Sequence, residues 1–224
     1  MSAIDASDII ITLQVATLAT LLSIVVGTPL AWVLARYRFR GRSVVEALTT
    51  LPLVLPPTVV GYYLLRALGR SSALGRFLEE DLGVRLVFTW QGAAIAAAVL
   101  SAPLLIRTAQ SAFEQVDPEL ERVAATLGRS RFSVFLSITL PLAMRGVAAG
   151  IALAFARAAG EFGATVMVAG NIPGETRTLP IAVYDAVQAG DIARANATAL
   201  LLVGISLTCL MLFSWTTLRF RRTP

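Results

Sequence analysis

Two opposite charges stand close together in an otherwise apolar part of the sequence. Arg157 and Glu161 are four residues apart in the segment FARAAGEFGAT, a spacing that places them on one face of a helix. A charged side chain at membrane depth is costly, so such a residue is a candidate for lining an ion path. The same pair can also be purely structural, because the two charges neutralise each other while helices pack. The sequence leaves both interpretations open.

A second group of polar residues follows in the segment NIPGETRTLP, residues 171–180. Its glycine and proline residues predict turns, and successive backbone N–H groups at such turns can receive an oxyanion. The side chains of Asn171, Thr176 and Arg177 would add donors to such a site. A plain docking turn for a soluble partner is the alternative, and the sequence does not rank the two.

The composition places these residues in a membrane protein. Hydrophobic residues make up 56% of the 224 residues and the mean hydropathy is +0.74, whereas soluble chains are about 45–50% apolar. All 19 basic residues are arginines in short clusters between apolar runs, which indicates membrane topology and no nucleic-acid partner. There is no histidine, and Cys209 is the single cysteine, so we expect no catalytic residue, no metal site and no cofactor.

Five apolar segments predict an all-α integral membrane protein with one transmembrane domain, residues 1–224. A bilayer needs about 20 apolar residues per helix. The expected spans are residues 9–35, 44–68, 90–106, 146–168 and 195–218. We expect Gly27-Thr28-Pro29 to kink the first span, and Gly146 and Gly150 to form a small-residue face on the fourth.

The second expected span contains Pro52, Pro56 and Pro57, which an unbroken helix would not tolerate. Broken backbone at membrane depth occurs where it is buried in protein or lines a watery cavity. A merely kinked helix is the alternative. The candidate residues of a translocation path are therefore Pro56, Pro57, Arg157, Glu161, Asn171, Thr176 and Arg177.

The distribution of arginines predicts the orientation. With the N-terminus outside and the C-terminus cytoplasmic, the cytoplasmic segments contain most of the 19 arginines, and the outer segments contain many acidic residues. The N-terminus is acidic, with Asp5 and Asp8 and no basic region, so we do not expect a cleaved signal peptide.

The polar loop of residues 109–141 predicts two short helices. Asp117 can cap the first helix, and Gly128 can end it. Ser130 can cap the second. The first helix has an apolar stripe formed by Leu120, Val123, Ala124 and Leu127, and the second has one formed by Phe132, Phe135 and Leu136. Helices this short are marginal in water, so we expect them to dock on a partner or to lie on the membrane surface.

This loop resembles the cytoplasmic EAA loop of ABC importer permeases. Gly128 is followed, after nine residues, by Ile138-x-Leu140-Pro141, as in that family. The resemblance implies a coupling helix that sits in a cleft of an ATP-binding subunit. The family's glutamate lies six residues before the glycine, where this chain has Arg122. The implied coupling residues are Glu121, Ala124, Ala125, Leu127, Gly128 and Pro141.

Three further segments, LPLVLPPTVVGYYLL, FARAAGEFGAT and NIPGETRTLP, resemble the molybdate branch of these permeases. The resemblance implies a type I ABC importer permease bundle in a bacterial cytoplasmic (inner) membrane. It also implies a homodimer, two cytoplasmic ATP-binding subunits, an external substrate-binding protein and the oxyanion substrate molybdate, with tungstate as a co-substrate. ATP would be bound by the partner, because the chain has no GxxxxGK[ST] loop. A sulfate or thiosulfate permease and a stand-alone secondary carrier are the alternatives.

Overall fold

The computed structural model describes residues 5–219, with side chains as far as residue 212, and this part of the chain contains helices and no strand. The elements are α1 (Ala6–Arg36), α2 (Arg42–Val54), α3 (Pro57–Leu68), α4 (Ala73–Arg76), the π-helical turn η1 (Phe77–Asp81), α5 (Trp90–Glu114), α6 (Pro118–Thr126), α7 (Arg131–Val134), the π-helical turn η2 (Phe135–Thr139), α8 (Leu140–Ala159), α9 (Gly163–Ala169), α10 (Leu179–Gln188) and α11 (Ile192–Arg219).

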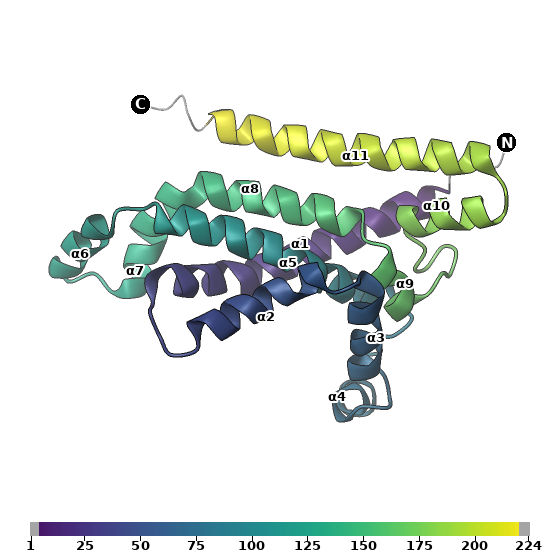
Figure 1. Cartoon of the computed structure of the whole chain (residues 1–224), viewed down its shortest axis with the longest axis horizontal. Helices are drawn as coiled ribbons and strands as arrows, with labels where there is room; N and C mark the ends of the chain where they lie inside the picture. Colours follow the sequence, from purple (N-terminus) through teal and green to yellow (C-terminus); the bar gives the residue numbers. More distant parts are fainter. Residues whose placement is uncertain (1–4, 220–224) are drawn as a thin grey trace.

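The long helices form a bundle. In the described residues, four helical runs are long and apolar enough to cross a membrane: α1, α5, residues 131–159 and α11. The pair α2 and α3 makes a fifth candidate if the bent pair counts as one span. In Figure 1, α1, α5 and α8 run lengthwise, with α6 and α7 at one end and α9 and α10 at the other. The structure is therefore an all-α bundle of about five spans.

Small residues bring the central helices close together. A Cβ atom added at Gly146 of α8 would lie 2.3 Å from Cβ of Ala112, and one at Gly150 would lie 3.2 Å from the carbonyl oxygen of Leu105. Both neighbours belong to α5, so the small-residue face of α8 packs on α5. The helix α1 continues through Pro29 to Arg36, and the expected kink at Gly27-Thr28-Pro29 stays a prediction.

The fourth expected span, residues 146–168, is not one helix. The helix α8 already begins at Leu140 and ends at Ala159, and residues 160–162 separate it from the short helix α9. The expectation was wrong because the segment AGEFGA is apolar on average, and averaging hides a helix stop at Gly160.

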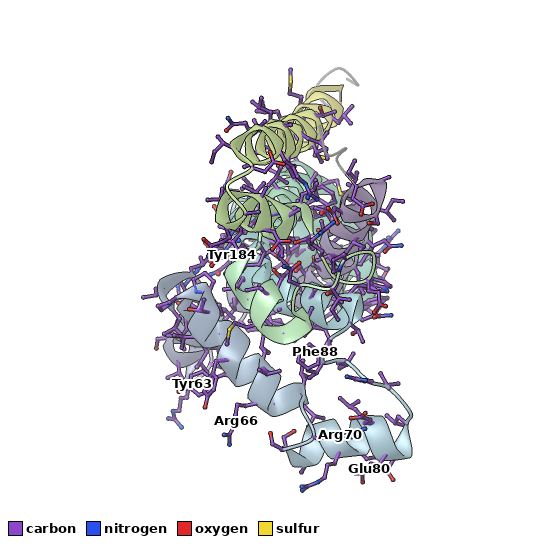
Figure 2. All side chains as sticks on the ribbon, turned by 90° about the vertical axis from the view of Figure 1, so that its right-hand side faces the viewer. Tyr63, Arg66, Arg70, Glu80, Phe88 and Tyr184 are labelled. Atoms are coloured by element: carbon purple, nitrogen blue, oxygen red, sulfur yellow. The ribbon has the colours of Figure 1, made fainter. Side chains whose placement is uncertain are left out.

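A polar excursion leaves the bundle between α3 and α5. Figure 2 shows Tyr63 and Arg66 on α3, which leads to this excursion, and Arg70 and Glu80 in the excursion itself, which projects away from the other helices. Arg70 donates two hydrogen bonds to Glu79, at 2.7 and 2.6 Å. The excursion ends at Phe88, whose N–H donates to the Val168 carbonyl at 3.0 Å and so ties its end to α9.

Candidate functional site

Two helical segments are interrupted, one between α2 and α3 and the other between α8 and α9, and the two interruptions lie close together. The backbone breaks at Leu55 and Pro56, and α2 and α3 lie at 111° to each other. Pro57 then occupies the first turn of α3, where its missing N–H costs no hydrogen bond. The break is far larger than a kink, which confirms the expectation of broken backbone at these prolines.

The helices α3 and α9 contact each other through two glycines. A Cβ atom added at Gly61 would lie 2.8 Å from Cα of Ala164, and one at Gly163 would lie 3.0 Å from Cβ of Pro57. Figure 1 shows the two short helices at the same end of the bundle. Pro57 therefore belongs to the contact between the two breaks, and Pro56 directly precedes it. Their role in a translocation path stays a prediction.

Glu161 lies in the break between α8 and α9 and bonds to both helices. Its Oε2 atom lies 2.6 Å from Nη1 of Arg157. Its Oε1 atom accepts a hydrogen bond from the Ala164 N–H at 2.9 Å, one of the groups that the first turn of α9 leaves without a helical partner. The predicted ion pair forms, but the two residues do not share a helix face, because α8 ends at Ala159.

The environments of these two charges differ. The Glu161 side chain is 2% exposed, whereas the Arg157 side chain is 31% exposed. Glu161 thus has a structural role as a buried link between α8 and α9. Arg157 is partly exposed, and a role for it in lining the path of an anion stays a prediction.

Arg177 is enclosed by carboxylates. Its Nε donates to Oδ1 of Asp8 at 2.9 Å, and its other nitrogens lie 3.4 Å from Oδ2 of Asp5 and 3.8 Å from Oδ2 of Asp185. The hydrogen bond with Asp8 raises the pKa of Arg177 above its usual value, against the opposing effect of burial. The charge of Arg177 is therefore fixed and already neutralised.

The other two polar side chains of the 171–180 segment also form hydrogen bonds within the protein. The Asn171 side chain donates to Oδ1 of Asp185 at 3.0 Å. The Thr176 hydroxyl is buried and accepts from the Ile172 N–H at 3.1 Å. Asn171 and Arg177 therefore hold the segment against α10 and α1, whereas Thr176 bonds within the segment. Reception of an oxyanion by Asn171, Thr176 and Arg177 stays a prediction.

The polar loop at the opposite end of the bundle forms the two expected short helices. Asp117 accepts from the Glu119 N–H at 2.9 Å at the start of α6, and Ser130 accepts from the Ser133 N–H at 3.3 Å at the start of α7. Between the two helices, Gly128 has φ +80°, a conformation that favours glycine. Local capping chemistry therefore defines both helices.

The helix α6 presents an apolar surface that no described residue covers. Leu120 is 48% exposed, Val123 57% and Leu127 78%. Ala124 is buried, so it belongs to the inner side of the helix rather than to this surface. Ala125 and Pro141 are exposed.

In the second short helical segment, Phe132 and Leu136 are exposed, whereas Phe135 packs against Trp32 and Phe113. The expected apolar stripe is therefore divided between the interior and the surface.

Glu121 points into the protein. It lies 2.8 Å from Nη2 of Arg36 and accepts a hydrogen bond from the Thr139 hydroxyl at 2.6 Å. Arg36 also donates to the Val116 carbonyl at 2.9 Å. One carboxylate thus joins α6 to the end of α1 and to η2. Sequence reasoning missed this network, because no local signal relates Glu121 to Arg36.

Comparison with known proteins gives consistent results. The family profile described as binding-protein-dependent transport system inner membrane component matches residues 27–223. The chain is 43% identical over 208 residues to the molybdenum transport system permease protein of Escherichia coli, covering 92% of this chain and 91% of that protein. It is 38% identical over 211 residues to a sulfate transport system permease protein of Salmonella typhimurium, covering 94% and 75%.

Among solved structures, the methionine ABC transporter MetNI in an inward-facing conformation aligns with a TM-score of 0.70. The alignment covers 96% of this chain and 93% of that chain at 17% identity, and it therefore bears on the fold alone.

Proposed function

Because the chain belongs to the family of binding-protein-dependent transport system inner-membrane components, we propose that it is the membrane-spanning permease subunit of an ATP-driven molybdate importer. Identity to the molybdenum permease extends over nearly the full length of both proteins. The sulfate permease is less similar, and a quarter of its length lies outside the alignment. Molybdate therefore fits better than sulfate, and a stand-alone carrier does not fit the family.

The observation that carries this proposal is the exposed apolar surface of α6. Leu120, Val123 and Leu127 project from a capped helix at the end of the bundle opposite α9 and α10 (Figure 1). An apolar surface that is exposed in the isolated subunit marks a site that a partner covers in the complex. The partner would be a cytoplasmic ATP-binding subunit, so this end faces the cytoplasm and the start of α1 faces outside.

The complete transporter would contain two copies of this chain, two ATP-binding subunits and an external binding protein that delivers the oxyanion. The chain itself would bind no cofactor, since the partner binds ATP. Tungstate, an oxyanion of the same shape and charge as molybdate, would share the path. The two permease copies would line this path and alternate between outward and inward access.

The contacts of Glu121 supply a mechanical connection for this cycle. A movement of α6 would act on α1 through Arg36 and, through Thr139, on η2, which leads directly into α8. At its far end, α8 is joined to α9 by the Arg157–Glu161 pair, and α9 contacts α3. Docking at one end can therefore reach the broken helices at the other through packed and hydrogen-bonded elements.

Cysteine crosslinking tests the docking surface. In a Cys209→Ser background, Leu127→Cys and Ala125→Cys should crosslink to a co-expressed ATP-binding subunit, because both positions are exposed on α6. Ala124→Cys is the matched control, since Ala124 directly precedes Ala125 and its side chain is buried. Equal crosslinking from Ala124 and Leu127, or none from Leu127 in an assembled complex, would contradict docking through this surface.

A further inference from the structure

A cleft of about 540 Å³ lies between the end of α1, α6 and α7, and its lining does not include Leu120, Val123 or Leu127 of the exposed apolar surface. Its charged lining consists of four arginines and a single carboxylate. The arginines are Arg36, Arg122, Arg129 and Arg131, and the carboxylate is Glu121.

The charges that line this cleft do not balance. Glu121 is already paired with Arg36 and hydrogen-bonded to Thr139. Arg122 pairs only with Glu119, and both side chains of that pair are more than half exposed. A pair with such exposure is screened by water and is readily exchanged for another partner.

Arg129 and Arg131 have only neutral partners. Arg129 donates to the Ser137 hydroxyl at 3.2 Å, and Arg131 donates to the Tyr37 hydroxyl at 3.2 Å. Among the side chains that the structure describes, no carboxylate lies within ion-pairing distance of either guanidinium. The cleft therefore presents two unpaired positive charges and a third that is weakly paired.

The surroundings of the cleft indicate which kind of anion it fits. Leu127 is 78% exposed and Phe132 is 70% exposed, on the two short helices that border the cleft. Because α6 lies beyond the ends of the long helices in Figure 1, lipid acyl chains would not reach these apolar side chains, whereas a protein surface would cover them while placing carboxylates next to the arginines. In Figure 1, α6 also lies at the extreme end of the long axis, beyond the long helices of the bundle.

We propose that this cleft receives acidic side chains of the ATP-binding subunit, and that the partner's surface is an apolar groove with carboxylates at its rim. Glu121 is used within the protein, whereas Arg129 and Arg131 have no carboxylate partner among the described side chains and are free to meet the partner. The contact therefore has a defined polarity, cationic on this chain and anionic on the ATPase. This inference rests on the proposed function, since it specifies the chemistry of the same docking site.

Charge reversal tests the polarity of the contact. The double variant Arg129→Glu/Arg131→Glu, in nanodiscs, should bind the purified ATP-binding subunit about tenfold or more weakly than the unchanged permease at low salt, because like charges would face each other. Binding to the unchanged permease should weaken as salt rises, and binding to Arg129→Ala/Arg131→Ala should depend less on salt. The matched control is Arg38→Glu/Arg40→Glu, which changes the net charge equally at exposed arginines outside the cleft lining.

Three outcomes would overturn the inference. The first is unchanged affinity of a folded Arg129→Glu/Arg131→Glu variant, and the second is an equal loss in the control. The third is a loss seen only in nanodiscs of anionic lipid, which would identify a headgroup as the occupant.

Leu127→Asp separates this inference from the proposed function. If Leu127→Asp abolishes binding and the arginine variants do not weaken it, docking stands and its acidic chemistry is wrong. If Leu127→Asp also binds normally, the docking site itself is wrong.

Discussion

At the residue scale, Glu121 joins elements within the permease, because its carboxylate is bonded to Arg36 and Thr139. Its contacts with Arg36 and Thr139 leave its carboxylate turned away from the exposed face of α6. The position at which the related EAA loops carry glutamate holds Arg122 here, and its side chain is exposed. The role of the glutamate in this chain is therefore separable from ATPase binding.

We predict that Glu121→Ala keeps ATPase binding within about twofold but lowers substrate uptake per ATP hydrolysed several-fold, because α6 loses its charge-assisted links to α1 and η2. Glu121→Gln should recover part of the ratio, since its amide oxygen can still accept from Thr139. The measurements are binding affinity, ATP hydrolysis and uptake in the same proteoliposomes. Loss of ATPase binding in a folded Glu121→Gln variant would show that Glu121 contacts the partner directly.

The ion pair of Arg157 and Glu161 is either purely structural or serves the anion, and two variants distinguish these roles. Arg157→Ala alone should impair assembly, because removing one partner of a buried ion pair costs about 3–5 kcal/mol. Arg157→Ala/Glu161→Gln should restore assembly, since the glutamine is neutral and its oxygen can still accept from the Ala164 N–H. Folded yield and uptake are measured for both variants. A double variant with normal uptake identifies a structural pair, whereas one that assembles and transports slowly identifies Arg157 as a residue that serves the anion.

Local chemistry explains which residues the sequence could identify. Asp117, Gly128 and Ser130 act on their own neighbouring backbone, so their roles can be predicted from position alone. Asp8 and Arg177 are 169 residues apart, and only the fold brings them together. The sequence therefore suggested Arg177 as an anion site, although its charge is already neutralised by acidic partners.

At the element scale, the break before α3 could be predicted from the local sequence, whereas the break before α9 could not. Three prolines in the second span made its break predictable, because proline removes a backbone donor. The break after α8 contains no proline, and Glu161 within it accepts a hydrogen bond from the Ala164 N–H in the first turn of α9. Sequence periodicity does not reveal such a contact, and the fourth span was predicted as continuous for that reason.

The contact between the two broken helices can be tested at Gly61. Gly61→Val should destabilise the permease by about 1–3 kcal/mol and reduce uptake, because the added side chain would overlap the backbone of α9 at Ala164. The matched control is Gly204→Val in α11, where an added Cβ atom has no neighbour within 4 Å. Thermal unfolding of the purified permease in detergent measures the difference. Equal stability of the two variants would mean that α3 and α9 do not pack as closely as described.

At the scale of the whole molecule, the two ends of the bundle have different chemistry. One end has short capped helices with exposed apolar residues and unpaired arginines. The other end has a loop fastened to α1 by the ion pairs of Arg177, together with the contact between the broken helices. This division corresponds to a permease that receives a driving partner at one end and opens its path at the other.

A measurement of oxyanion uptake decides whether this chain is the permease of a molybdate importer. Proteoliposomes containing the chain, its ATP-binding subunit and the external binding protein are supplied with internal ATP and radiolabelled molybdate. We predict ATP-dependent molybdate uptake that excess tungstate suppresses and excess sulfate does not. Uptake of sulfate in preference to molybdate, or molybdate uptake that needs no ATP, would contradict the account.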